Sequence, residues 1–165
     1  MKESNNKRIY HSIDPVYDKN SKILILGSFP SIVSRDNNFY YAHPKNRFWK
    51  VLGELYNIEF NTIEDKKKFL LDNYIALYDV VKSCTITGSS DSSIKDIEIN
   101  DIKSIVKNSN ITKIYTTGKT SYNLYNKYLK DIVGIDAIYL PSTSPANATI
   151  SYNELLDYYK IIKRP

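Results

Sequence analysis

The sequence predicts an α/β protein, a three-layer α/β/α sandwich built on a central, mainly parallel four-stranded sheet. Short apolar runs that suit buried strands alternate with longer segments in which apolar residues recur at helical spacing. Strands and helices that alternate in this way form parallel sheets with helices on both faces. The chain has 165 residues, 42% of them hydrophobic, and no flexible linker divides it, so residues 1–165 are expected to form one domain.

The first strand and two helices are predicted from the first half of the chain. Residues 22–27 (KILILG) form a continuous apolar run that ends in glycine, which predicts a buried central strand. Pro44 is placed to open the next helix, because proline is tolerated in a first turn. The apolar stripe expected on that helix consists of Phe48, Val51, Leu52 and Leu55. Another helix is expected over residues 64–73, with Phe69 and Leu70 facing inward.

Further along, residues 75–81 (IALYDVV) are expected to form a second strand, followed by a polar loop over residues 82–93. Asn100 is expected to cap the helix after this loop, because an asparagine side chain accepts hydrogen bonds from the free amides of a first turn. The helix itself carries Ile102, Ile105 and Val106 on its apolar side.

The last two strands are predicted at residues 113–116 (KIYT), which lead into Gly118 and a tyrosine-rich helix, and at residues 137–140. A capping box between Ser151 and Glu154 starts the final helix, since the two side chains can satisfy each other's backbone amides. The residues expected to be buried by this helix are Leu155, Tyr158 and Ile162.

Composition excludes several classes of protein. A single cysteine, Cys84, excludes a disulfide framework and any metal or iron–sulfur site made of four cysteines. Two histidines argue against a metal enzyme, so no metal and no other cofactor is expected. A formal net charge of +5 is compatible with an anionic partner. The amino terminus lacks the apolar core of a signal peptide, and no apolar run approaches the roughly 18 residues of a membrane span, so a soluble, cytoplasmic protein is expected.

The most informative segments follow the first predicted strand. Residues 27–31 (GSFPS) form a turn that leaves the strand, and residues 40–49 (YYAHPKNRFW) place two aromatic pairs beside a His-Pro and an asparagine. Parallel α/β folds bind ligands at the carboxyl ends of their strands, where these segments are expected to lie. Stacking surfaces next to hydrogen-bonding groups suit a flat ligand with polar edges, such as a nucleobase.

Four blocks in order carry a family resemblance: GSFPS at 27–31, YYAHPKNRFW at 40–49, ALYDVVKSC at 76–84 with GSSDSSI at 88–94, and LPSTSPAN at 140–147. Through them the chain resembles the uracil-DNA glycosylase superfamily, most closely its hypoxanthine-DNA glycosylase branch. The resemblance spans most of the chain and implies the fold of that superfamily. It also implies a monofunctional DNA glycosylase that excises a deaminated base, above all hypoxanthine, in base excision repair. DNA containing deaminated bases is the implied partner, and a monomer is expected.

Asn46 is the implied catalytic residue. Superfamily members often carry Asp or Asn at the third position of the first motif to position the attacking water, but this chain has Phe29 there. In the hypoxanthine branch the resemblance gives that role to the Asn of HPxN, here Asn46. An oriented water and amides that stabilise the departing base suffice for hydrolysis through an oxocarbenium-like state. The alternative is that Asn46 only caps the following helix.

Tyr41 and Asp79 are the implied contacts to the base. Tyr41 would stack on the flipped base and offset part of the cost of unstacking it. An ionised Asp79 would accept a hydrogen bond from the ring N–H that hypoxanthine, xanthine and uracil share, and would face a lone pair in adenine or cytosine. The alternative is a strand-end Asp79 that caps the next turn. The other predicted base-binding residues are Gly27, Ser28, Phe29 and Thr117, the last standing where the branch has an asparagine.

Predicted DNA contacts lie in two loops. Residues 140–147 combine prolines with small hydroxylated residues, and such a loop can present backbone amides to phosphates and a small wedge to the duplex. Several relatives have a leucine wedge at its end, where this chain has Ala146. Read without the family, the segment is only a rigid surface loop. The predicted DNA-binding residues are Ser31, His43, Ser142, Ser144, Ala146 and Asn147.

Other functions remain compatible with the sequence. The same chemistry on uracil, xanthine or mismatched bases is a close alternative. From another class, the chain could be a catalytically weak binder of damaged DNA, or a nucleotide-binding α/β module that shares only the architecture. Lys45 is expected to be exposed and no other lysine is placed as a Schiff-base former, so no lyase step is expected. The residues expected to brace the pocket rather than form a catalytic triad are Ser89, Ser90, Asp91 and Ser92.

Overall fold

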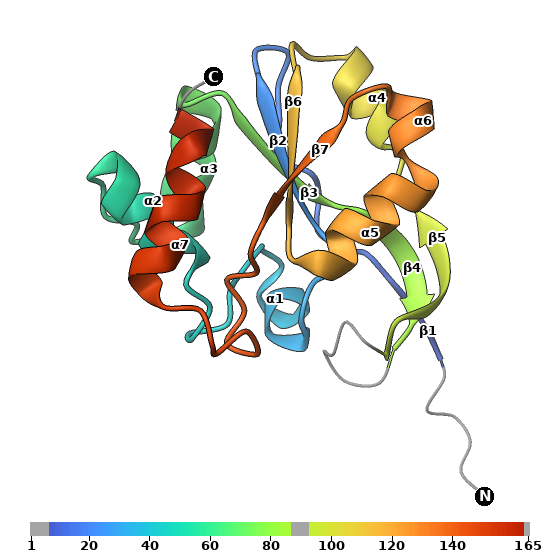
Figure 1. The fold of residues 1–165 in the computed structure, drawn as a ribbon, viewed down its shortest axis with the longest axis horizontal. Coiled ribbons are helices and arrows are strands. Elements are labelled where there is room, and N and C mark those ends of the chain that lie inside the picture. The colour runs from blue at the N-terminus through green and yellow to red at the C-terminus, as the bar shows by residue number, and fades with distance from the viewer. Residues whose placement is uncertain (1–6, 87–92, 164–165) are drawn as a thin grey trace, which may run out of the picture.

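The computed structural model describes residues 7–86 and 93–163 and contains a four-stranded parallel sheet. The strands are β2 (Ile23–Gly27), β3 (Ile75–Asp79), β6 (Lys113–Thr117) and β7 (Ala137–Leu140). They pair in the order β3-β2-β6-β7, and every pair is parallel. Figure 1 shows this sheet between two layers of helices, so the predicted three-layer α/β/α sandwich is confirmed.

Helices cover both faces of the sheet (Figure 1). One layer holds α2 (Phe48–Tyr56), α3 (Ile63–Asp72) and α7 (Tyr152–Tyr159), which continues into a 3-10 turn at Lys160–Lys163. The other layer holds α4 (Ile102–Lys107), α5 (Lys119–Tyr128) and α6 (Lys130–Val133). The short helix α1 (Ile32–Asn37) follows β2 at the carboxyl ends of the strands, the lower edge in Figure 1. No described helix combines the length and the apolar character that a bilayer crossing requires.

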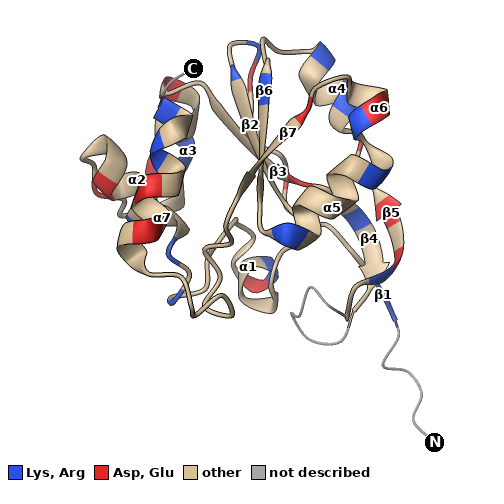
Figure 2. Ribbon diagram, in the orientation of Figure 1, with Lys and Arg blue, Asp and Glu red and all other residues tan. Residues whose placement is uncertain are grey.

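Basic side chains are spread over both helical layers, as Figure 2 shows. At the carboxyl edge of the sheet, the segments 28–50, 118–122 and 141–154, which follow β2, β6 and β7, carry two acidic residues, Asp36 and Glu154. The basic residues in the same segments are Arg35, Lys45, Arg47, Lys50 and Lys119. A polyanion that approached this edge would therefore meet more positive than negative side chains.

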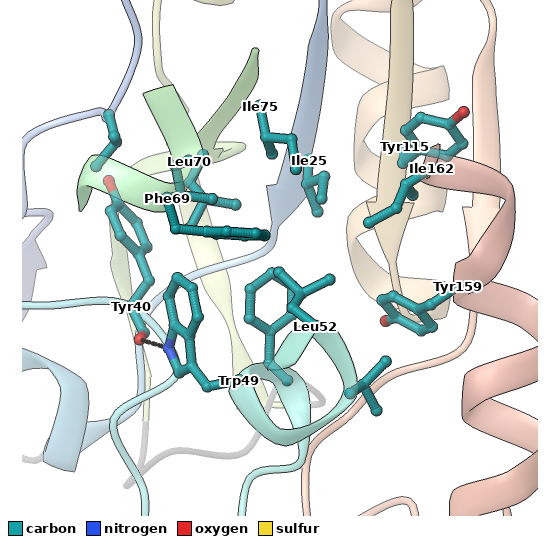
Figure 3. Close-up of a cluster of buried hydrophobic side chains, with 14 of the residues drawn as sticks. Ile25, Tyr40, Trp49, Leu52, Phe69, Leu70, Ile75, Tyr115, Tyr159 and Ile162 are labelled. Atoms are coloured by element: carbon teal, nitrogen blue, oxygen red, sulfur yellow. Dashed lines mark hydrogen bonds between the residues drawn. The ribbon is translucent and has the colours of Figure 1, made fainter. Parts of the chain in front are cut away.

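Each helical layer has its own hydrophobic core, because successive side chains of a strand point to opposite faces of the sheet. Ile25 of β2 packs with residues of α2, α3 and α7, whereas the next residue, Leu26, packs with residues of α4 and α5. Figure 3 shows the first of these cores. In it Trp49 is buried and donates its indole N–H to the Tyr40 carbonyl at 2.9 Å, which ties α2 to the loop before it.

The sequence does not predict the second sheet, which consists of β1 (Arg8–Tyr10), β4 (Val81–Thr85) and β5 (Lys95–Ile99) in the antiparallel order β1-β4-β5. The strand expected over residues 75–81 is instead two strands, since β3 stops at Asp79 and Val81 starts β4 in the other sheet. The loop expected over residues 82–93 therefore begins as a strand. The alternation of buried and exposed residues in β4 is hard to recognise in the sequence, because the polar residue Ser83 occupies a buried position.

Two helix starts differ from the predictions. Helix α2 begins at Phe48 and not at Pro44, because the intervening residues form a turn that Asn46 closes with its backbone amide and side chain. Asp101 and not Asn100 caps α4, and its carboxylate accepts from the third amide of that helix. Asn100 is buried, and its side chain donates instead to backbone carbonyls at the junction between the two sheets.

The predictions for α3 and α7 are largely confirmed. Both residues of α3 predicted to face inward are buried. In α7 the capping box between Ser151 and Glu154 is present. The buried aromatic residue of α7 is Tyr159, whereas Tyr158 is 50% exposed, so the expected core position of Tyr158 is wrong. The helix begins where its cap predicts, and Leu155 and Ile162 are buried as predicted.

Buried tyrosines are expected to make the fold sensitive to alkaline pH. Burial raises the pKa of Tyr40 and Tyr159 well above the usual value of 10.0 and raises the pKa of Tyr125 to about 12. Above pH 10 the unfolded chain ionises these phenols while the folded chain keeps them protonated. The folded state then binds more protons, so the free energy of unfolding falls with rising pH, by up to about 1.4 kcal/mol per pH unit for each tyrosine.

Guanidinium unfolding curves recorded at about pH 9 and about pH 11 measure this loss. Tyr40→Phe is the comparison, because it removes one of the phenols together with its hydrogen bonds to the Ile13 and Asp14 carbonyls. The variant should be less stable at neutral pH but lose less stability between the two alkaline conditions. Equal losses in the two proteins would contradict the expectation.

Candidate active site

Three parallel strands end side by side and bring the first predicted site residues together. β2 ends at Gly27, which pairs in register with Asp79, the last residue of β3. A Cβ atom added to Gly27 would lie 2.5 Å from Asp79 Oδ1 and 3.2 Å from the Tyr41 hydroxyl. Thr117, the last residue of β6, has its Oγ1 3.4 Å from the same hydroxyl. Glycine fits at position 27 because a side chain would fill the space where the carboxylate and the phenol meet.

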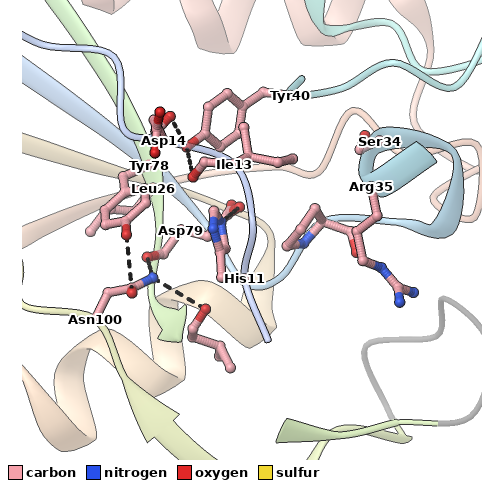
Figure 4. Close-up of polar contacts among 12 residues, drawn as sticks. His11, Ile13, Asp14, Leu26, Ser34, Arg35, Tyr40, Tyr78, Asp79 and Asn100 are labelled. Carbon is pink, nitrogen blue, oxygen red and sulfur yellow. Dashed lines mark hydrogen bonds and ion pairs between the residues drawn. The ribbon is translucent and has the colours of Figure 1, made fainter. Parts of the chain in front are cut away.

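Asp79 is buried against His11, a residue that the sequence analysis does not single out. His11 Nε2 lies 2.8 Å from Asp79 Oδ2, and the two side chains are 1% and 5% exposed (Figure 4). The histidine directly follows β1, 68 positions before Asp79. The sequence marks it only as one of two histidines. A buried hydrogen bond of this length holds the carboxylate in one orientation.

Asn100 fixes the backbone that carries Asp79. Its side-chain amide donates to the carbonyls of Asp79 at 2.9 Å and Val81 at 3.2 Å, and its Oδ1 accepts from the Tyr78 hydroxyl at 3.1 Å (Figure 4). Burial, followed by the charge of Asp79, raises the pKa of Tyr78, so this hydroxyl stays a neutral donor. Asn100 is itself buried, and it therefore locks the junction where the chain passes from one sheet to the other.

Tyr41 is held in a strained backbone conformation beside Asp79. Its φ of 54° lies in the left-handed region, which costs a bulky residue on the order of 1 to 3 kcal/mol. Its ring stacks on Phe48, with the centroids 3.9 Å apart and the planes at 18°. The next amide, that of Ala42, donates to the buried Ser34 hydroxyl at 3.1 Å. Strain that the surroundings maintain in this way is concentrated at functional sites.

The Asn46 side chain is fixed by two hydrogen bonds to its oxygen. Oδ1 accepts from the Phe48 amide at 2.9 Å and from the Thr143 hydroxyl at 2.8 Å. The backbone amide can only donate, so the atom facing it must be the oxygen, and the orientation of the carboxamide is settled. The predicted capping role and the predicted site role are therefore compatible. The oxygen caps α2, while Nδ2 has no partner among the described residues.

Asn46 thereby connects α2 to the loop after β7. The Arg47 amide donates to the Thr143 carbonyl at 3.1 Å, and the Arg47 guanidinium donates to the carbonyls of Asn147 at 3.1 Å and Ile150 at 2.8 Å. Thr143 is 1% exposed. The two loops form one unit at the carboxyl edge of the sheet, so the position of Asn46 depends on β7 as well as on β2.

Hydrogen bonds within the loop after β7 shape the predicted DNA contacts there. The Ser144 amide donates to the Ser142 hydroxyl and the Ala146 amide donates to the Ser144 hydroxyl, each at 3.1 Å. The Asn147 side chain donates to the Ser142 carbonyl at 3.0 Å. Ala146 is exposed at the tip. The serines thus build a rigid loop whose tip presents only a small side chain.

The predicted DNA contacts in the first loop are turn residues. The Ser31 hydroxyl accepts from the Ser34 amide at 3.1 Å and caps α1. His43 Nδ1 accepts from the Lys45 amide at 3.0 Å. Both side chains are half-buried, whereas Lys45 is exposed as predicted. These contacts give the loop its shape and leave one edge of each side chain toward solvent.

Ser28 and Phe29, two further base-binding candidates, directly follow β2. Ser28 is buried, and its carbonyl accepts from the Val81 amide at 3.0 Å. The Phe29 ring is 8% exposed and stands edge-on to the His11 ring, with the centroids 6.1 Å apart. The segment expected to brace the pocket, Ser89, Ser90, Asp91 and Ser92, lies outside the described residues.

Two hollows on the described surface lie away from this cluster. One borders Trp49 and Phe60, and the other borders Tyr56 and Tyr74. Neither is lined by Gly27 or by the side chains that meet over it. Within the described ranges, no three His, Cys, Asp or Glu side chains lie close enough together to hold a metal ion. The arrangement of polar groups, rather than the size of a cavity, marks the strand ends as the candidate site.

Residues 15–162 match the family model of the uracil DNA glycosylase superfamily. The match includes the Gly27 cluster and Asn46 and begins after His11. A hypoxanthine DNA glycosylase from Methanosarcina barkeri is 39% identical over 137 residues, which cover 81% of this chain and 85% of that protein. A hypoxanthine DNA glycosylase from Methanosarcina acetivorans is 34% identical over 150 residues, which cover 90% of this chain and 94% of that protein.

A solved structure has the same fold. The solution NMR structure of a candidate uracil DNA glycosylase from Methanosarcina acetivorans superimposes with a TM-score of 0.80 at 34% sequence identity. The superposition covers 94% of this chain and 96% of that one. The similarity therefore includes both helical layers and the sheet.

Proposed function

The chain belongs to the uracil DNA glycosylase superfamily and is a DNA glycosylase, and on this premise we propose that it releases deaminated bases, above all hypoxanthine, by hydrolysing the N-glycosidic bond in DNA. The names of the two Methanosarcina relatives support hypoxanthine, since the similarity extends over most of both chains. The observation that carries the proposal is the Asp79 carboxylate, which is fixed at the end of β3 with Oδ1 directed over Gly27.

Asp79 Oδ1 is the acceptor that reads the base. Oδ2 is taken by His11, while none of the described residues donates to Oδ1. Hypoxanthine presents N1–H beside its carbonyl and can donate to Oδ1, whereas adenine presents a lone pair at N1 and would be repelled. Guanine and thymine carry a comparable N–H, so the weaker pairing of a damaged base in the duplex supplies further selectivity.

The base reaches this acceptor by leaving the duplex. Extrusion costs a few kcal/mol, and stacking on an aromatic ring returns about 1 to 3 kcal/mol per base. Tyr41, whose hydroxyl lies 3.2 Å from where a Cβ would stand on Gly27, is the stacking residue we assign. Lys45 and Lys119 stand in the segments that flank the site and would meet phosphates on either side of the extruded nucleotide.

Asn46 orients the attacking water in this mechanism. As the glycosidic bond lengthens, positive charge develops on the sugar, and the resulting oxocarbenium-like centre captures a positioned water without a strong base. Because Oδ1 of Asn46 is occupied, the Nδ2 hydrogens are the groups that bind the water. The exposed side chain of Lys45 is not placed to form a Schiff base, so the product is an intact strand with an abasic site. Such a product is the starting point of base excision repair.

Uracil is the second candidate base. The solved structure that this chain resembles is described as a candidate uracil DNA glycosylase. Uracil presents the same N–H beside a carbonyl, so Asp79 would accept from it in the same way. Release from inosine-containing and uracil-containing duplexes, compared in one assay, decides between the two bases.

Asn46→Ala tests the role of the carboxamide. We expect the single-turnover rate of hypoxanthine release from an inosine-containing duplex to fall on the order of 100-fold or more, because the water is no longer held. The variant also loses the cap on α2, which should cost about 1 kcal/mol in urea unfolding. Thr62→Ala, which removes the cap of α3, where the Thr62 side chain bonds only to the Asp65 amide among the described residues, should lose similar stability and keep the wild-type rate. An Asn46→Ala protein with the wild-type rate would remove Asn46 from the mechanism.

Gly27→Ala tests the placement of Asp79. The added methyl group would meet Oδ1 at 2.5 Å, and the carboxylate would have to move from a position that His11 fixes. We expect release of the base to fall on the order of 100-fold, as for a misplacement of about 1 Å. Gly134→Ala is the control, because its added Cβ has no atom within 4 Å; with a φ of +82° it should cost stability but not rate. Unchanged release by Gly27→Ala would show that the site does not need this space.

A further inference from the structure

His11 occupies a position that folding alone does not explain. Its ring is enclosed by the rings of Phe29, Tyr40 and Tyr78, with centroids between 5.0 and 6.2 Å away. Its backbone amide donates to the Lys82 carbonyl at 2.7 Å, which continues the pairing of β1 with β4. The backbone of His11 is thus held by the second sheet, while its ring lies against the end of β3 in the parallel sheet.

One ring nitrogen has a partner and the other does not. Nε2 lies 2.8 Å from Asp79 Oδ2, and an ionised carboxylate can only accept, so the proton of this bond is on Nε2. Nδ1 is buried and has no hydrogen-bond partner among the described residues. An orphan buried polar atom costs about 1 to 3 kcal/mol. A phenylalanine would fill the same aromatic cluster without that cost. The contribution that histidine makes at this position and phenylalanine cannot is therefore the hydrogen bond from Nε2 to Asp79.

The hydrogen bond between His11 and Asp79 decides which carboxylate oxygen of Asp79 faces the site. With Oδ2 held by His11, Oδ1 is turned toward Gly27, where it approaches the space beside the Tyr41 hydroxyl. Without a donor at Oδ2, a carboxylate that is 5% exposed would lose the hydrogen bond that fixes its orientation. Oδ1 would then no longer be held toward the base.

We propose that His11 is a specificity-determining positioning residue, which holds Oδ2 of Asp79 so that Oδ1 is kept as the acceptor for the N–H edge of the extruded base. This role rests on the proposed function and adds a residue that lies before the segment matched by the family model. It predicts that His11 controls the choice between bases with a donor and bases with an acceptor at this edge, and not only the rate.

The test compares two readouts in wild type, His11→Phe and His11→Gln. The first is the single-turnover rate of base release from inosine-containing and uracil-containing duplexes. The second is the inhibition of that release by free hypoxanthine and by free adenine, which reports recognition of the base without the chemical step. His11→Phe keeps the ring volume and removes the donor, whereas His11→Gln retains an N–H that can reach Oδ2. His11→Met is made alongside as a second apolar replacement in case His11→Phe does not fold.

For wild type we expect stronger inhibition by hypoxanthine than by adenine. In the apolar variants this preference should fall by about 10- to 100-fold, the worth of one hydrogen bond to a charged group, and the rate should fall with it. His11→Gln should recover part of both. Tyr10→Phe, at an exposed neighbouring position, should match wild type.

The outcomes separate the two proposals. A histidine that only supports the fold would lower the melting temperature and the rate and leave the hypoxanthine-to-adenine preference unchanged, and this result would overturn the role of His11. Wild type that releases uracil and not hypoxanthine would overturn the proposed substrate; free uracil then replaces free hypoxanthine in the comparison, because it carries the same N–H edge. An unchanged preference for uracil in the apolar variants would again overturn the role of His11.

Discussion

The in-register pairing of Gly27 with Asp79 is the constraint on which the site depends. Two neighbouring parallel strands end at the same level, and one of them ends without a side chain. The carboxylate of the other strand can therefore lean across the gap, to within 2.5 Å of where a Cβ would stand on Gly27. Tyr41 and Thr117 approach the same point from the loop after β2 and from β6. The acceptor at the centre of the proposed recognition site is thus placed directly by strand register.

Side chains from distant parts of the chain stabilise this arrangement. Asn100 holds the backbone at Asp79 and His11 holds its carboxylate, and both belong to segments next to the second sheet. That sheet, which the sequence pattern did not reveal, thus supports the proposed recognition site. Asn46 is held from the opposite side, through Thr143 of the loop after β7. The residues proposed to recognise the base and to position the water are consequently held by different parts of the fold.

Local patterns predicted the main sheet, and the family resemblance supplied the candidate site residues. The apolar runs at 22–27, 113–116 and 137–140 contain strands of the parallel sheet, and strand ends brought Gly27 and Asp79 together as expected. The second sheet was not predictable in this way, because its strands are short and Ser83 occupies a buried position. His11 was missed for a related reason. Its contact with Asp79 spans 68 positions and depends on the pairing of β1 with β4, which no local spacing encodes.

We propose that Asp79 accepts a hydrogen bond from the N–H edge of the extruded base. The most direct test of this proposal is the rate at which the wild-type protein releases the base from a duplex containing N1-methylinosine, compared with an otherwise identical inosine duplex. Methylation removes the hydrogen that Oδ1 would accept and leaves the glycosidic bond in place. We expect the rate to fall by at least about 10- to 100-fold, which is the contribution of a hydrogen bond to a charged group. Equal rates on the two duplexes would contradict the proposal.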